Sequence, residues 1–297
     1  MKKILITGAN SYIGTSFEKY MAQWPEKYQV DTVDMIDGTW REKDFSGYDT
    51  VFHVAGIAHS DTGHVSKERK AFYYKINRDL TFETAEKAKA DGVKQFIFMS
   101  SAIVYGDSAP IGKSKVITKD TMPSPANFYG DSKLQAENAI LPLQGEGFNV
   151  VVLRPPMIYG KGCKGNYSVL SKFATKLPIF PYVKNERSML YVENLCEFVR
   201  LMVENKEHGV FYPQNGEYSN TSELVKMIAG IHGKKVAIIK GFTWALKILS
   251  HMTGLVNKAF GSMSYDMSLS EYKENYRVCG LKESIERTEA CCGIPEV

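Results

Sequence analysis

The N-terminal segment constrains the fold most, because a strand, a glycine-containing turn and a helix follow one another there without interruption. The apolar run Ile4–Thr7 predicts a strand, and Thr15–Trp24 reads as a helix. The turn between them, Gly8–Gly14, has a glycine at each end. The first glycine permits a sharp strand-to-helix turn, and the second lets the helix pack closely on a sheet. The segment therefore predicts the opening unit of a parallel α/β sheet.

The same turn is a candidate dinucleotide site, because the free N–H groups at a helix N-terminus can bind a pyrophosphate. The pattern departs from the usual fingerprint at Ser11, which stands where a middle glycine is expected. A serine leaves less room, although its hydroxyl can itself bond a phosphate. A turn without a ligand is the alternative. We expect the cofactor to contact Gly8, Asn10, Ser11, Tyr12, Ile13 and Gly14.

An acidic residue ends the second predicted strand. Gln29–Val33 is apolar enough for a strand, and Asp34 follows it, twenty residues beyond Gly14. An acid there accepts hydrogen bonds from the adenosine ribose and repels a 2′-phosphate, which favours NAD over NADP. Asp31 is a competing acid, Arg41 could soften the repulsion, and a solvated strand-end carboxylate is the alternative role for Asp34.

Strand-like and helical segments alternate through the first half of the chain. This alternation predicts an α/β fold with a doubly wound parallel sheet, whose ligands lie beyond the carboxyl ends of the strands. Ala55, Gly56, Ser100 and Ser101 fall at such ends. The predicted strands are Ile4–Thr7, Gln29–Val33, Thr50–Ala55, Gln95–Ser100 and Val150–Leu153, and the helices between them include Tyr74–Ala90 and Ser132–Leu141.

The composition of the sequence changes after about residue 160, where prolines and glycines become frequent. We therefore predict a dinucleotide-binding domain over residues 1–160 and a smaller substrate lobe over residues 161–297, with some segments returning to the first domain. Helices are expected at Tyr191–Asn205 and Thr221–Ile231. Phe242–Phe260 has apolar residues at helical spacing with lysines between them, which favours a packed amphipathic helix over a membrane-surface helix.

Composition excludes several classes of protein. Among 297 residues, 37 basic side chains nearly balance 33 acidic ones, which disfavours nucleic acid as a partner. No segment approaches the length of a membrane span or a secretory signal, so a cytoplasmic protein without a membrane partner is expected. The five cysteines read as reduced thiols, with Cys291–Cys292 as the only adjacent pair, and none has metal-ligand spacing with histidine. His53, inside an apolar strand, reads as a satisfied core histidine.

Tyr129 and Lys133 are the strongest catalytic candidates. They are four residues apart, which on a helix places both side chains on one face. A lysine ammonium beside a tyrosine favours the phenolate and lowers the tyrosine pKa. Such a pair can take a proton from a sugar or alcohol hydroxyl, as proton-coupled hydride transfer requires.

Together these motifs resemble a known family. The N-terminal turn, Asp34, the segment Ser100–Gly106 and the Tyr129/Lys133 pair occur in the order seen in extended short-chain dehydrogenases/reductases. Within that group the chain resembles the NAD-dependent sugar-nucleotide epimerase/dehydratase family, and UDP-glucose 4-epimerases in particular. The resemblance runs from Met1 to about Val203 and continues weakly to Arg287.

The resemblance implies a role for each matching residue. Tyr129 would be the acid/base, and Lys133 would hold the nicotinamide ribose and depress the tyrosine pKa. Ser101 would bond the substrate oxygen, with Ser100 as the alternative if the register slips. The remaining matches are Asn77, which supports the active site; Ala55 and Gly56, beneath the nicotinamide ribose; Ser100 and Pro156, beside the cofactor; and Asn166 and Arg187, at the nucleotide diphosphate.

Departures from the family pattern reduce the number of reactions that this chain is expected to catalyse. Ala102 and Ile103 stand where a 4,6-dehydratase carries an acidic pair, which argues against elimination. Pro156 and Met157 replace residues found in many 4-epimerases, and Ser188 replaces the aspartate after Arg187. The C-terminal region is short and diverged.

The resemblance implies an NAD-dependent UDP-sugar 4-epimerase that acts through a transient 4-keto sugar. Its substrates would be UDP-Glc and UDP-Gal or their N-acetyl forms, in cell-surface polysaccharide synthesis. The alternatives are a nucleotide-4-ketosugar reductase that consumes NAD(P)H and, from another class, a non-enzymatic dinucleotide-sensing regulator. A homodimer through Tyr74–Ala90 and Phe128–Leu141 is the family expectation.

Overall fold

The computed structural model describes residues 1–57, 65–252 and 254–290, and it divides into two compact units. Each unit is assembled from separate stretches of the chain. Ala58, His59 and the Cys291–Cys292 pair lie outside the described residues. The first unit comprises Met1–Asp107, Met122–Pro155 and Leu195–Pro213, and the second comprises Ser108–Thr121, Pro156–Asn194 and Gln214–Val297.

The first unit contains a six-stranded sheet in the order β2-β1-β3-β4-β6-β10, and every neighbouring pair is parallel. The α/β prediction is confirmed. The chain steps outward from β1 to β2 and then crosses back to β3 on the other side of β1. This reversal creates a crevice at the carboxyl ends of β1 and β3. The strands are β1 (Lys2–Thr7), β2 (Tyr28–Val33), β3 (Thr50–His53), β4 (Gln95–Met99), β6 (Asn149–Leu153) and β10 (Gly209–Phe211).

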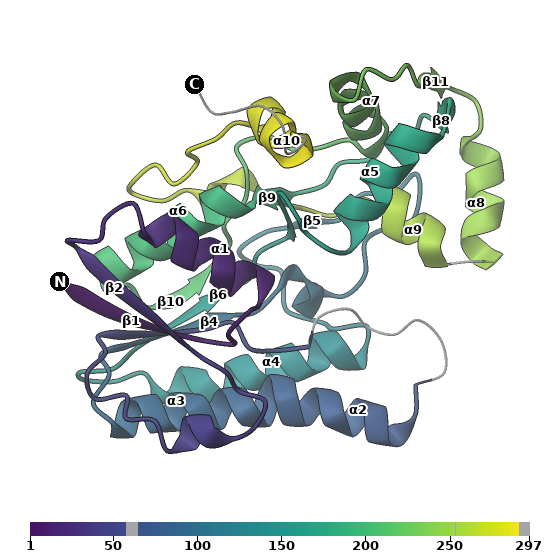
Figure 1. Ribbon diagram of the computed structural model, residues 1–297. Helices are drawn as coiled ribbons and strands as arrows, with labels where there is room; N and C mark the ends of the chain where they lie inside the picture. Colours follow the sequence, from purple (N-terminus) through teal and green to yellow (C-terminus); the bar gives the residue numbers. More distant parts are fainter. Residues whose placement is uncertain (58–64, 253, 291–297) are drawn as a thin grey trace. The chain divides into compact units, whose positions relative to one another are not determined.

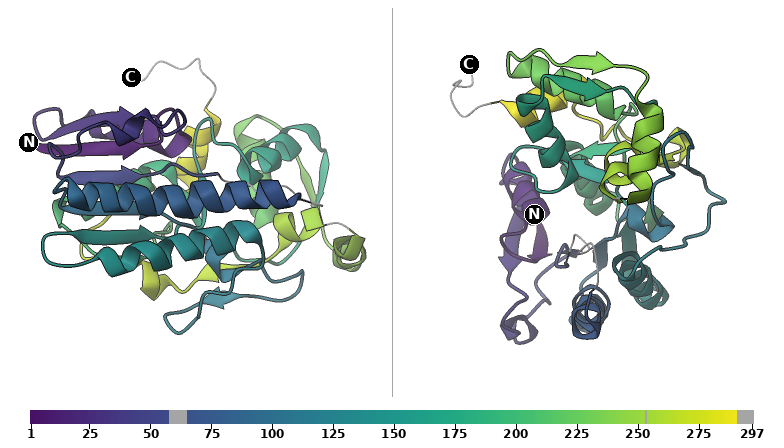
Figure 2. Two further views of the ribbon diagram at one scale, coloured as in Figure 1. Left: turned by 90° about the horizontal axis from the view of Figure 1, so that it is seen from below. Right: turned by 90° about the vertical axis from the view of Figure 1, so that its right-hand side faces the viewer.

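Helices cover both faces of this sheet (Figures 1 and 2). One layer holds α1 (Tyr12–Met21) and α6 (Val192–Glu204), and the other holds α2, α3 and α4. The single helix predicted over Tyr74–Ala90 is instead composite, because a π-helical turn separates α2 from α3. The members of this second layer are α2 (Lys67–Tyr74), the π-helical turn Lys75–Asp79, α3 (Leu80–Ala90) and α4 (Phe128–Ile140).

The interior of the first unit is largely apolar, and it encloses the imidazole of His53. Every residue of β3 and β4 is buried, as expected for parallel strands covered on both faces. His53 is fully buried, with Nδ1 2.7 Å from Thr7 Oγ1 and Nε2 3.1 Å from Thr81 Oγ1. Burial and the Lys133 charge lower the pKa of His53 to about 3. The prediction of a satisfied core histidine is confirmed.

The second unit is built from short parallel strand pairs and packed helices. Tyr159 is a buried centre of this packing, since its hydroxyl lies 2.5 Å from Ser284 Oγ and accepts a hydrogen bond from Asn215 Nδ2 at 2.9 Å. The strand pairs are β5–β12, β7–β9 and β8–β11. The bounds are β5 (Val116–Ile117), β7 (Met157–Tyr159), α5 (Asn166–Lys176), β8 (Ile179–Pro181), β9 (Met189–Tyr191), α7 (Thr221–Ile231), β11 (Ala237–Ile239), α8 (Thr243–Met252), α9 (Gly254–Phe260), β12 (Ser264–Tyr265) and α10 (Leu281–Glu289).

The predicted helix Phe242–Phe260 is two helices with different environments. In α9, Val256 and Phe260 are buried, so this part packs as predicted. In α8, Trp244 and Ile248 are exposed, because the helix lies at the outer edge of its unit (Figure 1). A packed amphipathic helix is therefore wrong for α8.

Three cysteines in the described part of the chain, Cys163, Cys196 and Cys279, are free thiols. No group of three or more metal-ligating side chains occurs among the described residues. Within those same residues, no helix combines the length and apolarity needed to cross a bilayer.

Candidate active site

The turn after β1 has the backbone geometry of an anion-binding loop. Gly8 has a φ of +102°, and a Cβ there would lie 2.9 Å from the backbone nitrogen of Ala55. Asn10 adopts the left-handed conformation with a φ of 64°. The turn is fixed to β2 because the N–H groups of Gly8 and Ala9 both donate to the carbonyl of Val33, at 3.0 and 3.2 Å. The cradle at the crevice between β1 and β3 thus requires a glycine.

Helix α1 begins in this turn with a serine cap. Ser11 Oγ accepts from the backbone N–H of Gly14 at 3.1 Å, so the unexpected serine caps the helix and keeps its own hydroxyl proton as a donor. Tyr12 and Ile13 open the helix, whose first turn carries no acidic side chain. Helix N-termini of this kind attract anions, so the residues present fit the pyrophosphate of a dinucleotide.

Asp34 lies directly after β2 and is exposed, with Oδ1 accepting from the backbone N–H of Ile36 at 2.8 Å. Its competitor Asp31 accepts from Tyr48 Oη at 2.9 Å and is thereby occupied. The Arg41 guanidinium binds the Glu83 carboxylate, with Nη2 2.6 Å from Oε2. Asp31 and Arg41 are thus both engaged by neighbouring side chains, whereas the Asp34 side chain is exposed.

A second group of predicted residues lies close together just after the carboxyl end of β3. A Cβ on Gly56 would lie 3.1 Å from both Asn77 Oδ1 and Lys133 Nζ. Asn77, in the π-helical turn, accepts from the backbone N–H of Ile57 at 2.8 Å and donates to Ser132 Oγ at 3.1 Å. The π turn aims this buried amide across the loop, as π-bulges do at functional sites. Gly56, Asn77 and Lys133 therefore form one contiguous cluster.

Tyr129 stands in the first turn of α4, one turn before Lys133. Asn127 caps this helix by accepting from the N–H of Gly130 at 3.0 Å. Gly130 allows a very close approach, since a Cβ there would lie 2.7 Å from the carbonyl oxygen of Ile103. The Ser101 hydroxyl interacts with Tyr129 closely enough to lower the tyrosine pKa. The sequence reasoning missed Gly130, although a glycine in the first turn of a helix is itself a signal.

The pKa values of the pair differ from the prediction. Burial raises the pKa of Tyr129 to about 12, against a smaller lowering by the Ser101 hydrogen bond. Burial also lowers the pKa of Lys133 to about 8. The expectation that Lys133 lowers the pKa of Tyr129 is therefore not met in this structure. Lys133 Nζ instead donates to the carbonyl of Met99 at 2.9 Å and lies 4.7 Å from the Phe98 ring centroid.

Ser100 points away from the proposed chemistry. Its hydroxyl donates to the buried Glu137 carboxylate, which also pairs with Arg154, Nε to Oε2 at 3.1 Å. Arg154 further donates to Tyr105 Oη at 2.7 Å. This buried network was not predicted, because a glutamate on a helix normally reads as an exposed charge. Between the two register alternatives, the geometry favours Ser101 as the hydroxyl beside Tyr129.

Three predicted residues belong to the second unit and are described within it. Pro156 precedes β7, and Asn166 begins α5 with an exposed side chain. Arg187 is half-buried, and its Nη1 donates to the carbonyls of Lys258 and Ala259 at 2.6 and 3.0 Å. Burial lowers the pKa of Arg187 to about 10. Among the described residues no carboxylate pairs with this guanidinium.

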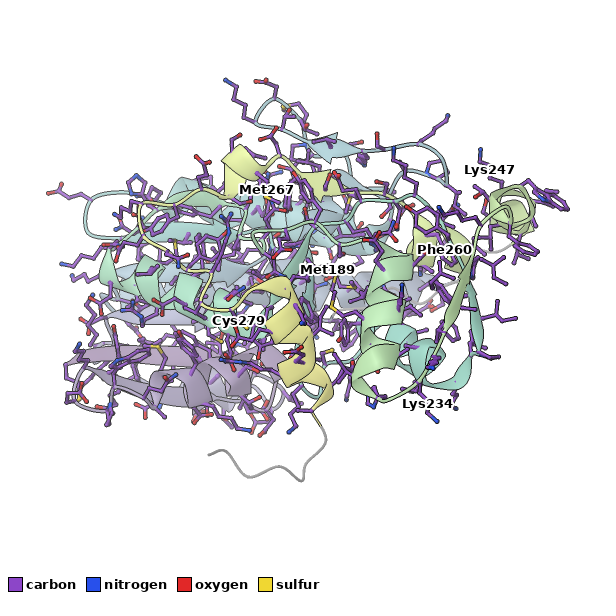
Figure 3. All side chains as sticks on the ribbon, turned by 90° about the horizontal axis from the view of Figure 1, so that it is seen from above. Met189, Lys234, Lys247, Phe260, Met267 and Cys279 are labelled. Atoms are coloured by element: carbon purple, nitrogen blue, oxygen red, sulfur yellow. The ribbon has the colours of Figure 1, made fainter. Side chains whose placement is uncertain are left out.

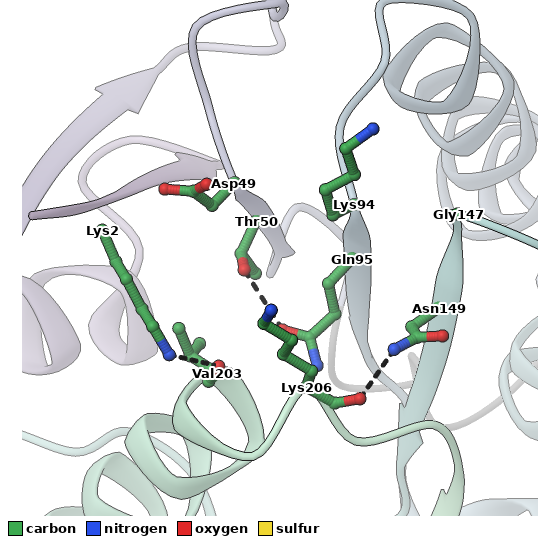
Figure 4. Close-up of a pocket in the computed structure, with 9 residues that line it drawn as sticks. All are labelled: Lys2, Asp49, Thr50, Lys94, Gln95, Gly147, Asn149, Val203 and Lys206. Carbon is green, nitrogen blue, oxygen red and sulfur yellow. Dashed lines mark hydrogen bonds between the residues drawn. The ribbon is translucent and has the colours of Figure 1, made fainter.

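A cavity at the other edge of the sheet involves none of the predicted residues. It has a volume of about 340 Å³ and lies at the amino ends of β1, β3, β4 and β6 (Figure 4). Lys2 Nζ donates there to the carbonyl of Val203 at 3.0 Å. The lining lacks a general acid/base pair, so the candidate active site is at the carboxyl edge.

Comparisons with known proteins identify a family and relatives that are similar to this chain. The family model described as "NAD dependent epimerase/dehydratase family" matches residues 4–213. The chain is 27% identical to a UDP-glucose 4-epimerase of Vibrio cholerae over 295 residues, which cover 90% of this chain and 88% of that one.

Solved structures share the fold. A UDP-glucuronic acid 4-epimerase from Bacillus cereus in complex with NAD superposes with a TM-score of 0.72 at 18% identity, covering 97% of each chain. A dTDP-4-dehydrorhamnose reductase from Bacillus anthracis in complex with NADP gives a TM-score of 0.73 at 17% identity, covering 97% of this chain and 98% of that one. Epimerases and reductases are thus both similar to this chain in fold.

Proposed function

The chain belongs to the NAD-dependent epimerase/dehydratase family, and from that premise we propose that it is a UDP-sugar 4-epimerase. It is an enzyme of the nucleotide-sugar epimerase type, and NAD is the cofactor of its family. Its substrates would be UDP-Glc and UDP-Gal or the N-acetyl forms. The observation that carries the proposal is the position of Tyr129 in the first turn of α4, one helical turn before the buried Lys133, with the Ser101 hydroxyl acting to lower the tyrosine pKa.

Different residues of the first unit would each bind one part of the cofactor. The Gly8–Gly14 turn would bind the pyrophosphate, Asp34 the adenosine ribose, and Lys133 the nicotinamide ribose beside Gly56 and Asn77. When bound there, NAD supplies a hydride acceptor for C4 of the sugar and returns the hydride to the opposite face. The protein's own task is to position the sugar and to move the 4-hydroxyl proton.

Tyr129 would move that proton with help from Ser101. The phenolate takes the proton from the 4-hydroxyl in the first half of the cycle, and the phenol returns it to the 4-keto oxygen in the second. Because burial raises the pKa of Tyr129 to about 12, the phenol is the resting form. The Ser101 hydrogen bond and the Lys133 ammonium must therefore favour the phenolate in the working complex.

Arg187 is the candidate for the nucleotide diphosphate. Its guanidinium is desolvated, fixed by two backbone carbonyls and unpaired with any carboxylate among the described residues. A guanidinium held in this way keeps its charge and its remaining N–H donors for an anion, and its fork matches phosphate oxygens. Asn166, exposed at the start of α5, is proposed as a second diphosphate contact.

The test combines cofactor analysis with turnover. Freshly purified protein is denatured to identify any released dinucleotide, and native protein is incubated with UDP-Glc and UDP-GlcNAc without added cofactor. Retained NAD together with interconversion supports the epimerase. Tyr129→Phe should lower the turnover at least roughly a thousandfold while NAD stays bound. Tyr73→Phe, which changes the ring 6.3 Å from Tyr129, is the matched control and should keep most activity. An active Tyr129→Phe variant would sink the assignment.

A 4-ketosugar reductase is the second candidate, and the raised pKa of Tyr129 favours it. A reductase needs only the phenol, which donates its proton to the keto oxygen as hydride arrives. The resemblance also places Pro156 and Met157 where they would restrict the sugar rotation that an epimerase requires. A protein purified without dinucleotide and inert until given a 4-keto sugar and NAD(P)H would replace the epimerase proposal with this one. A protein that binds NAD but changes no nucleotide sugar would favour a regulator.

The cellular setting follows as part of the same proposal. We propose a cytoplasmic homodimer in cell-surface polysaccharide synthesis, with α2, α3 and α4 as the dimer surface. In support, these helices form one layer on the sheet, and Phe72 of α2 is exposed on it. Phe72→Glu should convert a dimer to a monomer in sedimentation analysis, whereas an unchanged mass would contradict the proposed surface.

A further inference from the structure

One surface of the second unit combines exposed apolar side chains with an unbalanced positive charge. It is formed by α8, the β8–β11 pair that precedes it, and their connections, and it is called the basic apolar surface below. Trp244 and Ile248 on α8 are 66% and 59% exposed, and Ile179 on β8 is 53% exposed. Phe242 and Leu249 add 50% and 43% exposure. Large apolar side chains gathered in this way mark an interaction site.

The pattern along α8 is that of a helix lying on a surface. Trp244 and Ile248 are one turn apart and share a face, and Phe242 precedes the first turn. The strand β11 leads into this helix through Lys240, whose Nζ lies 5.6 Å from the Tyr182 ring centroid. Lys247 of α8 and Lys234, just before β11, both appear on the right-hand side of Figure 3, well apart from each other.

Two stretches of the sequence that contribute to this surface are rich in lysine, although Glu289 of α10 contacts Ser171 and His232, one residue of each stretch. Residues 156–185 contain five lysines, residues 224–265 contain six, and neither stretch contains an aspartate or a glutamate. All eleven lysines are exposed. The rest of the chain holds 26 basic and 33 acidic residues, so the positive charge is concentrated in these two stretches. The eleven lysines of these stretches are Lys161, Lys164, Lys172, Lys176 and Lys184, with Lys226, Lys234, Lys235, Lys240, Lys247 and Lys258.

We propose that the basic apolar surface binds the protein to an anionic lipid bilayer, with the apolar face of α8 in the headgroup region. Three observations favour a bilayer over a protein partner. Tryptophan and aliphatic side chains on one helix face are typical of interfacial helices. Lysines without intervening acids suit a continuous anionic surface rather than a patterned one. A tryptophan also prefers the boundary between apolar and polar phases.

This inference concerns attachment and is independent of the sugar chemistry. The surface lies within the second unit, and none of its residues takes part in the catalytic group on α4. Its failure would therefore leave the proposed reaction untouched.

The experiment is vesicle flotation of the full chain, with vesicles of phosphatidylcholine alone or of phosphatidylcholine with phosphatidylglycerol. The wild type should bind only the anionic vesicles, with a blue shift of Trp244 fluorescence, and salt should weaken binding. The double variant W244Q/I248Q should lower partitioning at least roughly tenfold, since each apolar anchor is lost. The variant K235Q/K240Q should lower it by roughly fivefold per lysine.

A matched control removes apolar side chains of similar exposure elsewhere. Met122 of the first unit and Val278 of the second are 80% and 45% exposed, and the variant M122Q/V278Q should bind vesicles like the wild type. Circular dichroism and sugar turnover should be unchanged in every variant. Absence of binding to anionic vesicles at low salt would overturn the proposal, as would equal losses in the control. A lipid-free dimer that W244Q/I248Q dissociates would overturn it in favour of a second copy of the chain.

Discussion

The two units of this protein use charge in opposite ways. In the first unit, the carboxylate of Glu137 on α4 is buried, and it pairs with Arg154 and accepts a hydrogen bond from the Ser100 hydroxyl. In the second, the lysines of residues 156–185 and 224–265 are exposed without acids among them, and Arg187 binds backbone carbonyls. Buried and paired charges fix geometry, whereas exposed charges are accessible to anions. The first unit thus contains buried, paired charges, and the second contains the two lysine-rich stretches.

Arg154→Met should have the largest effect on stability, because it leaves the Glu137 carboxylate charged in the interior. Removing one partner of a buried pair costs about 3–5 kcal/mol. Denaturant unfolding of the two proteins measures the loss. Arg41→Met, which breaks an exposed pair with Glu83, is the control and should cost no more than about 1 kcal/mol. Similar losses in both would mean that the Arg154 network does not hold the first unit together.

The buried imidazole of His53 makes the first unit sensitive to acid. Its folded pKa is about 3 against an ordinary value of 6.5, so below pH 6.5 the unfolded chain takes up the proton first. Stability therefore falls as the pH drops from 6.5 toward 3, by up to about 1.4 kcal/mol per unit, or roughly 2.7 kcal/mol over two units. His53→Gln should show a shallower slope in unfolding measured across this window. Parallel slopes would contradict the assignment.

Local sequence patterns predicted the first unit well for a physical reason. Its strands are mostly apolar runs of five or six residues, so β1 to β4 and β6 lie within about two residues of the predicted positions. The second unit resisted prediction because its strands have only two or three residues, too few to show a period. The exposed face of α8 was missed because periodicity shows that a helix has an apolar side but not whether anything covers it.

The candidate site divides in the same way. Residues placed by one turn or one helix, such as Gly8, Tyr129 and Lys133, follow from their spacing. The Glu137–Arg154 pair joins α4 to the residue that follows β6, 17 positions later in the chain. No local sequence pattern predicts this contact. The pKa of Tyr129 was also mispredicted, because spacing puts a lysine nearby but does not show that burial outweighs it. The site roles themselves remain predictions.

Arg187→Met should weaken binding more than it lowers stability, which is the opposite of the expectation for Arg154→Met. The variant loses two hydrogen bonds to carbonyls but also relieves a desolvated charge, so its free energy of unfolding should change by no more than about 1 kcal/mol. Its affinity for UDP should fall by about 2 kcal/mol, roughly thirtyfold, measured by calorimetry with UDP. Arg187→Lys should recover only part of this loss, because an ammonium cannot pair bidentately. Unchanged UDP affinity together with lost stability would make Arg187 structural.

Two glycine substitutions compare the units at the smallest scale. A Cβ on Gly56 would lie 3.1 Å from Lys133 Nζ, so Gly56→Ala should push the ammonium from its place. A displacement of this kind should lower the turnover roughly tenfold, about 1.4 kcal/mol, with little loss of stability. Gly216 of the second unit is the matched control, since its Cβ would meet only Arg277 Cδ at an ordinary 3.5 Å. Gly216→Ala should keep full turnover. Equal turnover in both variants would mean that the Lys133 position tolerates displacement, and the tight cluster of Gly56, Asn77 and Lys133 would then be packing rather than preorganisation.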